Sequence, residues 1–80
     1  MAERVKEEIE KLTVEVGQKN GKIWHATFTV KEVLARAEMP NTPTNQNHVR
    51  YVVNRFYPGS KVLPPQRDDG GTLEMKIRSV

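Results

Sequence analysis

The sequence predicts a small α+β domain. Apolar residues recur with helical spacing in three segments and alternate with polar residues in others, so both helices and strands are expected. The chain has 80 residues, 36% hydrophobic and 29% charged, which is an ordinary composition for a folded protein. We found no internal repeat, and we therefore expect one domain over residues 1–80 with one compact core.

The first segment predicts a helix over Ala2–Leu12, because its apolar residues share one face at i, i+4 and i+7. These residues are Val5, Ile9 and Leu12. From Leu12 onward the apolar period changes to two, so residues 12–16 also fit a strand. Whether the stretch up to residue 16 is helix or strand stays open at this point.

A hairpin is predicted around Asn20-Gly21, where a second alternating stretch runs to Val30. A three-residue loop with Gly21 in the left-handed conformation puts Val16 opposite Trp24 and Val14 opposite Ala26. That register places the large apolar residues on one side of the hairpin.

A second helix is predicted from Val30 to Glu38, before Pro40. Thr29 and Glu32 have the spacing of a capping box, in which the threonine hydroxyl accepts from the backbone N–H three residues on. This is the clearest helix start in the chain.

A third helix is predicted from Pro43 to Phe56, with Thr42 as its N-cap and Pro58-Gly59 as its stop. Its expected buried stripe consists of Val49, Val52, Val53 and Phe56. The residues on the opposite side of this helix are polar, and helical geometry turns them outward.

The end of the chain predicts a second hairpin, in which Lys61–Leu63 and Thr72–Val80 flank a loop. Asp69-Gly70-Gly71 supplies turn residues, and the two prolines after Leu63 make the first strand an edge strand.

This order of elements is that of a winged helix-turn-helix domain, in which the second of the paired helices reads DNA and the terminal hairpin forms the wing. The connection of residues 39–44 is longer than usual between such helices. The alternative arrangement is two antiparallel hairpins that form one sheet, with two helices packed on one face.

The charge distribution points to the third helix as the candidate binding surface. The net charge is +3, and residues 1–22 are balanced, so the surplus lies in the rest of the chain. Met39–Arg67 contains no acidic residue. Asn and Arg side chains suit base edges and phosphates, so we expect binding residues on the outward helix face and near the wing. These are Asn47, His48, Arg50, Tyr51, Asn54, Arg55, Lys61 and Arg67.

The leading hypothesis is a small non-enzymatic nucleic-acid-binding module, a class that includes transcriptional regulators. The alternative is a protein-binding inhibitor or accessory module of a larger assembly, because exposed Tyr and Arg are typical of protein interfaces. In that case Leu73–Val80 would be a partner-binding strand if it lay outermost in the sheet.

Other functional classes find little support in the residues. The chain has no cysteine, and neither His25 nor His48 has a second ligand at metal-binding spacing. We therefore expect no catalytic residues, no metal site and no cofactor. The start lacks a signal-peptide pattern, and uncharged runs are too short for a membrane span, so we expect a cytoplasmic protein. A homodimer through the apolar face of the first helix is also expected.

Overall fold

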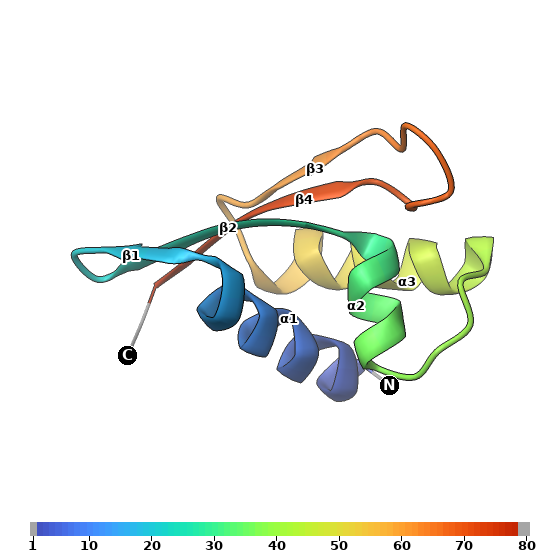
Figure 1. Ribbon diagram of the computed structural model, residues 1–80, viewed down its shortest axis with the longest axis horizontal. Coiled ribbons are helices and arrows are strands. Elements are labelled where there is room, and N and C mark those ends of the chain that lie inside the picture. The colour runs from blue at the N-terminus through green and yellow to red at the C-terminus, as the bar shows by residue number, and fades with distance from the viewer. Residues whose placement is uncertain (1, 79–80) are drawn as a thin grey trace.

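The computed structural model describes residues 2–78, and its elements follow the predicted order (Figure 1). In chain order they are α1 (Ala2–Val16), β1 (Gln18–Asn20), β2 (Ile23–Thr29), α2 (Val30–Arg36), α3 (Pro43–Phe56), β3 (Lys61–Leu63) and β4 (Thr72–Arg78). The last two residues of the predicted terminal strand, Ser79 and Val80, lie outside the described part. The predicted α+β class is confirmed.

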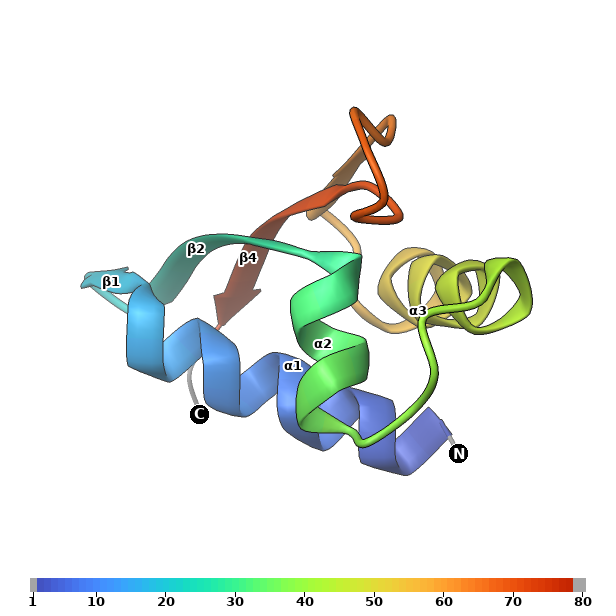
Figure 2. The ribbon, with the colours of Figure 1, turned by 45° about the vertical axis from the view of Figure 1, so that its right-hand side comes forward.

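The strands form one antiparallel sheet of order β1-β2-β4-β3, and all three helices cover the same face (Figures 1 and 2). β2 pairs with β4 along its whole length, from Ile23 opposite Arg78 to Thr29 opposite Thr72. The β3–β4 hairpin is therefore the wing of a winged-helix-like arrangement, and β1 adds a second hairpin. β4 lies between β2 and β3 over residues 72–74 and is not outermost there, whereas over residues 75–78 no strand within residues 2–78 pairs with it on the β3 side.

The core lies between the covered sheet face and the inner stripes of the helices. Its buried residues come from every helix and from the two long strands, and they include Val5, Ile9, Phe28, Val33, Leu34, Val49, Val52, Val53, Leu73 and Met75. The apolar face of α1 belongs to this core, so the dimer contact expected through Val5, Ile9 and Leu12 is wrong. None of the helices within residues 2–78 is long and apolar enough to cross a membrane.

The first helix is longer than predicted, and the expected hairpin register is wrong. α1 continues to Val16, and the side chains of Val14 and Val16 are both 56% exposed. β1 follows the helix and places Lys19 opposite Trp24, with Gly21 at a φ of 67° in the turn. Within the extended helix Thr13 turns inward and donates its hydroxyl to the carbonyl of Ile9 at 2.7 Å, so its polar group is satisfied in the core.

The second helix starts as predicted and stops two residues early. The Thr29 hydroxyl accepts from the backbone N–H of Glu32 at 3.1 Å, as its capping role requires. The helix ends at Arg36, because Glu38 adopts a φ of 57° and lets Met39 N–H bond back into the last turn. Such a left-handed residue is the usual end of a helix, although glycine is the usual residue there.

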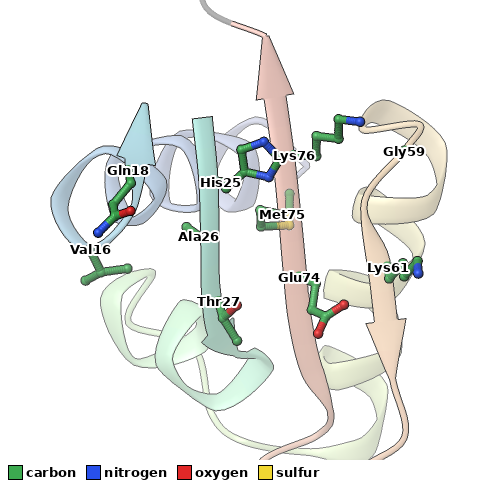
Figure 3. Close-up of a pocket in the computed structure, with 10 residues that line it drawn as sticks. All are labelled: Val16, Gln18, His25, Ala26, Thr27, Gly59, Lys61, Glu74, Met75 and Lys76. Carbon is green, nitrogen blue, oxygen red and sulfur yellow. The ribbon is translucent and has the colours of Figure 1, made fainter. Parts of the chain in front are cut away.

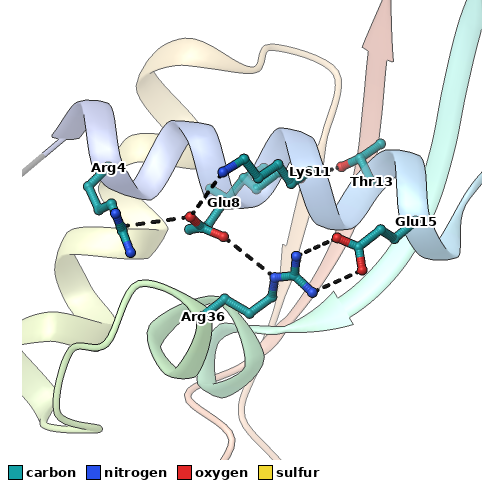
Figure 4. Close-up of polar contacts among 7 residues, drawn as sticks. Arg4, Glu8, Lys11, Thr13, Glu15 and Arg36 are labelled. Carbon is teal, nitrogen blue, oxygen red and sulfur yellow. Dashed lines mark hydrogen bonds and ion pairs between the residues drawn. The ribbon is translucent and has the colours of Figure 1, made fainter.

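An ion-pair cluster joins α1 to α2 (Figure 4). Glu8 is only 5% exposed, and its carboxylate pairs with Arg4 and Lys11 on its own helix and with Arg36 of α2 at 3.5 Å. Arg36 also forms two hydrogen bonds to Glu15. A buried carboxylate needs such partners, so the cluster fixes the position of α2 on α1.

The end of α3 reverses one predicted burial. Phe56, expected in the core, is 41% exposed, whereas the next residue, Tyr57, is 9% exposed. Tyr57 is the C-cap, with φ −127° and ψ 69°, so the chain leaves the helical path there and directs its ring inward. The Tyr57 hydroxyl donates to Glu10 Oε2 at 2.6 Å and ties α3 to α1.

This contact makes stability fall at alkaline pH. Burial, followed by the hydrogen bond to Glu10, raises the pKa of Tyr57 above its ordinary value of 10.0. The neutral phenol is thus favoured in the folded state, and its contribution is complete below pH 10 and is lost as pH rises through the folded-state pKa. We expect urea unfolding to show a decline in stability above about pH 10 that is smaller in Tyr57→Phe.

A spectroscopic measurement tests the same contact directly. The chain has two tyrosines, so Tyr51→Phe leaves Tyr57 as the only source of tyrosinate absorbance. That absorbance should stay absent at pH 10 while the protein is folded. Its appearance at pH 10 in folded protein would contradict the assignment.

Candidate nucleic-acid interface

The outward face of α3 presents polar side chains on a helix whose position is fixed by its opposite face. Thr42 caps the first turn by accepting from Asn45 N–H at 3.2 Å, and Pro43 occupies the first turn. The predicted bounds of this helix are confirmed. Val49, Val52 and Val53 are fully buried, so the residues on the far side of the helix face outward.

The side chains brought together on that outward face are Asn47, Tyr51, Asn54 and Arg55. All four are exposed, and Tyr51 is 59% exposed. None of them forms an ion pair within the described residues. The helix therefore offers amide groups, a phenol and a cation to a ligand on this side, without a neighbouring carboxylate on its own segment.

Arg50 lies at the edge of this face and contacts the wing. It is half-buried, and its guanidinium donates to the carbonyl of Gly70 at 2.5 Å and to the side chain of Asn47. Two of its donors are thus engaged within the protein. In this structure Arg50 joins helix to wing, whereas the sequence analysis placed it among the outward residues.

A second set of contacts holds the wing against the helix pair. Gln46 donates to the Asn41 side chain at 2.7 Å, and Asn41 donates to the carbonyl of Asp68 at 2.9 Å. The first backbone N–H groups of α2, from Val30 and Lys31, donate to carbonyls of residues 71 and 69. Because these bonds come from three separate segments, the wing has a defined position beside α3.

The wing loop carries Arg67, which is exposed. The two aspartates that follow are turn residues, as predicted: Asp69 Oδ1 accepts from Gly71 N–H at 2.9 Å. The phosphate contact expected of Arg67 stays a prediction.

Lys61 lies away from this surface. It is in β3, in register with Glu74, and it lines a shallow depression on the open sheet face together with His25 and Lys76 (Figure 3). This face is opposite the helices, so the structure does not bring Lys61 together with the α3 residues.

His48 is also displaced from its expected role. The residue is half-buried, and its Nε2 atom is buried without a hydrogen-bond partner among the described residues. Within the same part of the chain, no group of three or more His, Cys, Asp or Glu side chains could hold a metal ion.

A cationic surface at the C-terminal end of α3 was not predicted from the sequence. Lys6 and Arg55 lie over the ring of Phe56, although the first of them is about 50 residues away in the chain. No local pattern signals this pairing, because it depends on how α1 crosses α3.

Comparison with protein-family models, curated proteins and solved structures found no match to this chain.

Proposed function

We propose that the protein is a small nucleic-acid-binding module that places α3 in the major groove of duplex DNA, with the wing beside the backbone. The observation that supports it is the exposed row of Asn47, Tyr51 and Asn54, flanked by Arg55 and by a tethered wing. An α-helix with its side chains is about 10–12 Å across and fits a groove about 12 Å wide.

The exposed side chains have distinct roles in this proposal. Asn54 suits the edge of adenine, since its amide can donate and accept in one plane, whereas Asn47 offers its amide NH₂ as a donor because its Oδ1 accepts from Arg50. Arg55 and Arg67 contact phosphates on either side, and Tyr51 contacts sugar or phosphate. Arg50 acts as a positioning residue for the wing, and Lys61 is left out of the interface because of its place on the open sheet face.

The second candidate is a protein-binding inhibitor or accessory module. It is favoured by the exposure of two aromatic side chains on one helix, Tyr51 at 59% and Phe56 at 41%. The first candidate is preferred for the α3 face because Met39–Arg67 has no carboxylate to repel phosphates.

A binding titration tests the DNA proposal. Fluorescence anisotropy with a labelled duplex of mixed sequence should show binding at low salt that weakens steeply as salt rises, towards a Kd of about 10⁻⁴–10⁻⁶ M at physiological salt. The matching single strand should bind more weakly. Absence of duplex binding even at low salt would reject the proposal.

Variants separate the roles. Arg55→Ala and Arg67→Ala should each weaken binding and lower the salt slope by about 1, since each removes a phosphate contact. Arg50→Ala should weaken binding while the slope stays unchanged, because its guanidinium contacts Gly70. Lys19→Ala is the control: this exposed lysine lies in β1, at the far end of the sheet from α3 (Figure 1).

A further inference from the structure

A groove runs between the end of α3, the first half of α1 and the end of β4. Its lining combines apolar and cationic side chains. Among these side chains are Lys6, Phe56, Pro58, Lys76, Ile77 and Arg78. Residues far apart in the sequence therefore build one surface, which meets the outward row of α3 at Arg55 and the open sheet face at Lys76.

The apolar part of the groove centres on Phe56. This ring is 41% exposed, and the half-buried Ile77 lies in the same lining. Lys6 Nζ lies 4.4 Å from the ring centroid, and Arg55 Cζ lies 5.4 Å from it. The ring therefore holds two cations at the mouth of the groove.

Within residues 2–78, the cations around this groove have no ion-pair partner. Lys6, Arg55, Lys76 and Arg78 form no ion pair with any carboxylate in the described part of the chain. One acid, Glu10, lies in the lining, and it accepts a hydrogen bond from Tyr57. Among residues 2–78, three cations and one carboxylate line the groove and Arg55 lies over its exposed ring, which leaves a positive, partly apolar concavity.

We propose that this groove binds an acidic peptide segment of a partner protein, in which carboxylates alternate with apolar side chains. Its carboxylates pair with Lys6, Lys76 and Arg78, and an apolar side chain packs on Phe56. A peptide of this composition matches the lining, because the three lining cations lie beside the apolar side chains of Phe56 and Ile77. The module would then join a nucleic acid on one side to a protein on the other.

A labelled peptide tests the inference without knowledge of the natural partner. The probe is a short fluorescein-labelled peptide in which Glu alternates with Leu, and binding is followed by anisotropy at low and physiological salt. Two comparison peptides replace all Glu by Gln, or all Leu by Ser. The Glu-Leu peptide should bind the intact protein, and each comparison peptide should bind about tenfold more weakly.

Matched variants locate the binding. Lys6→Gln with Lys76→Gln removes two groove cations, whereas Lys19→Gln with Lys31→Gln removes two exposed lysines outside the groove and leaves the same net charge. The groove pair should weaken peptide binding about tenfold and the control pair should not. Phe56→Ala should weaken it as well, and circular dichroism checks that this variant is folded.

Several results would overturn the inference. These are equal binding of the Gln and Glu peptides, equal effects of the two lysine pairs, or absence of peptide binding at low salt. Loss of duplex DNA binding in the groove pair, without peptide binding to the intact protein, would assign the groove to the nucleic-acid surface instead. The α3 proposal is measured separately, with Arg67→Ala as its own variant, so failure of one leaves the other standing.

Discussion

Gly17→Ala is expected to lower the free energy of unfolding by about 3 kcal/mol or more, because the new methyl group has no space. A Cβ at this position would lie 2.4 Å from the carbonyl oxygen of Thr13, 2.5 Å from that of His25 and 2.9 Å from Ala26 Cβ. Two of these atoms are backbone atoms, one in α1 and one in β2. The substitution therefore forces the helix and the sheet apart at the point where the chain passes between them.

Urea unfolding measures this effect, with Gly21→Ala as the matched control. Gly21 has a φ of 67° and no atom of residues 2–78 within 4 Å of its would-be Cβ, so its substitution carries only the conformational cost of about 1–2 kcal/mol. Gly17 does not have a positive φ, so the cost of its substitution comes from steric overlap and not from backbone strain. If Gly17→Ala were no more destabilising than Gly21→Ala, the close approach of α1 and β2 would be wrong.

The second large effect is expected at the base of the wing. Gly71→Ala combines a left-handed backbone, with a φ of 115°, and a Cβ only 2.8 Å from the carbonyl oxygen of Leu63. We expect a loss of about 3 kcal/mol, from roughly 1–3 kcal/mol of backbone strain plus the displacement of β3. The carbonyl of Gly71 also accepts from Val30 N–H at 3.0 Å, so the start of α2 is disturbed too.

Gly59→Ala is the matched control for the wing. Gly59 has a similar φ of 96°, but the nearest atom to its would-be Cβ is the flexible end of Lys76 at 4.0 Å. Gly59→Ala should lower the free energy of unfolding only by the cost of backbone strain. Under conditions where both variants are folded, Gly71→Ala should also weaken duplex binding, whereas Gly59→Ala should not. Equal stability losses in the two would show that β3 is not held close to Gly71.

The helix pair was predictable because its signals are local. Thr42-Pro43 and Pro58-Gly59 act within a few residues of the helix ends, and the structure gives α3 the predicted bounds. Thr29 caps α2 by the same local logic. The end of α2 was missed, because a left-handed Glu38 has no such signature in the sequence.

The boundary after α1 was ambiguous because Leu12 and Val16 fit two periods. Their spacing of four suits a helix, and their alternation with Thr13 and Glu15 suits a strand. The outcome depends on contacts that the local sequence does not show: Thr13 is buried with its hydroxyl bonded inside the helix, and Gly17 lies against β2.

The candidate site was predictable as a face but not as a set of contacts. Helical geometry alone places Asn47, Tyr51 and Asn54 outward. The engagement of Arg50 by Gly70 depends on a loop 20 residues away, and the place of Lys61 depends on the pairing of β3. Tyr57 is buried instead of Phe56 because the backbone leaves the helix between them. A pattern with a regular period of 3.6 residues does not predict such a departure.

The order of strands in the sheet has a consequence for behaviour at high concentration. The two edge strands, β1 and β3, have three residues each, carry Lys19 and Lys61, and β3 is followed by two prolines. The two long strands, whose apolar residues favour aggregation, lie inside the sheet. Short, charged edges give a neighbouring molecule little backbone to pair with. This protection applies where β1 and β3 cover the long strands, whereas residues 26–29 of β2 and 75–78 of β4 are each paired on one side only within residues 2–78.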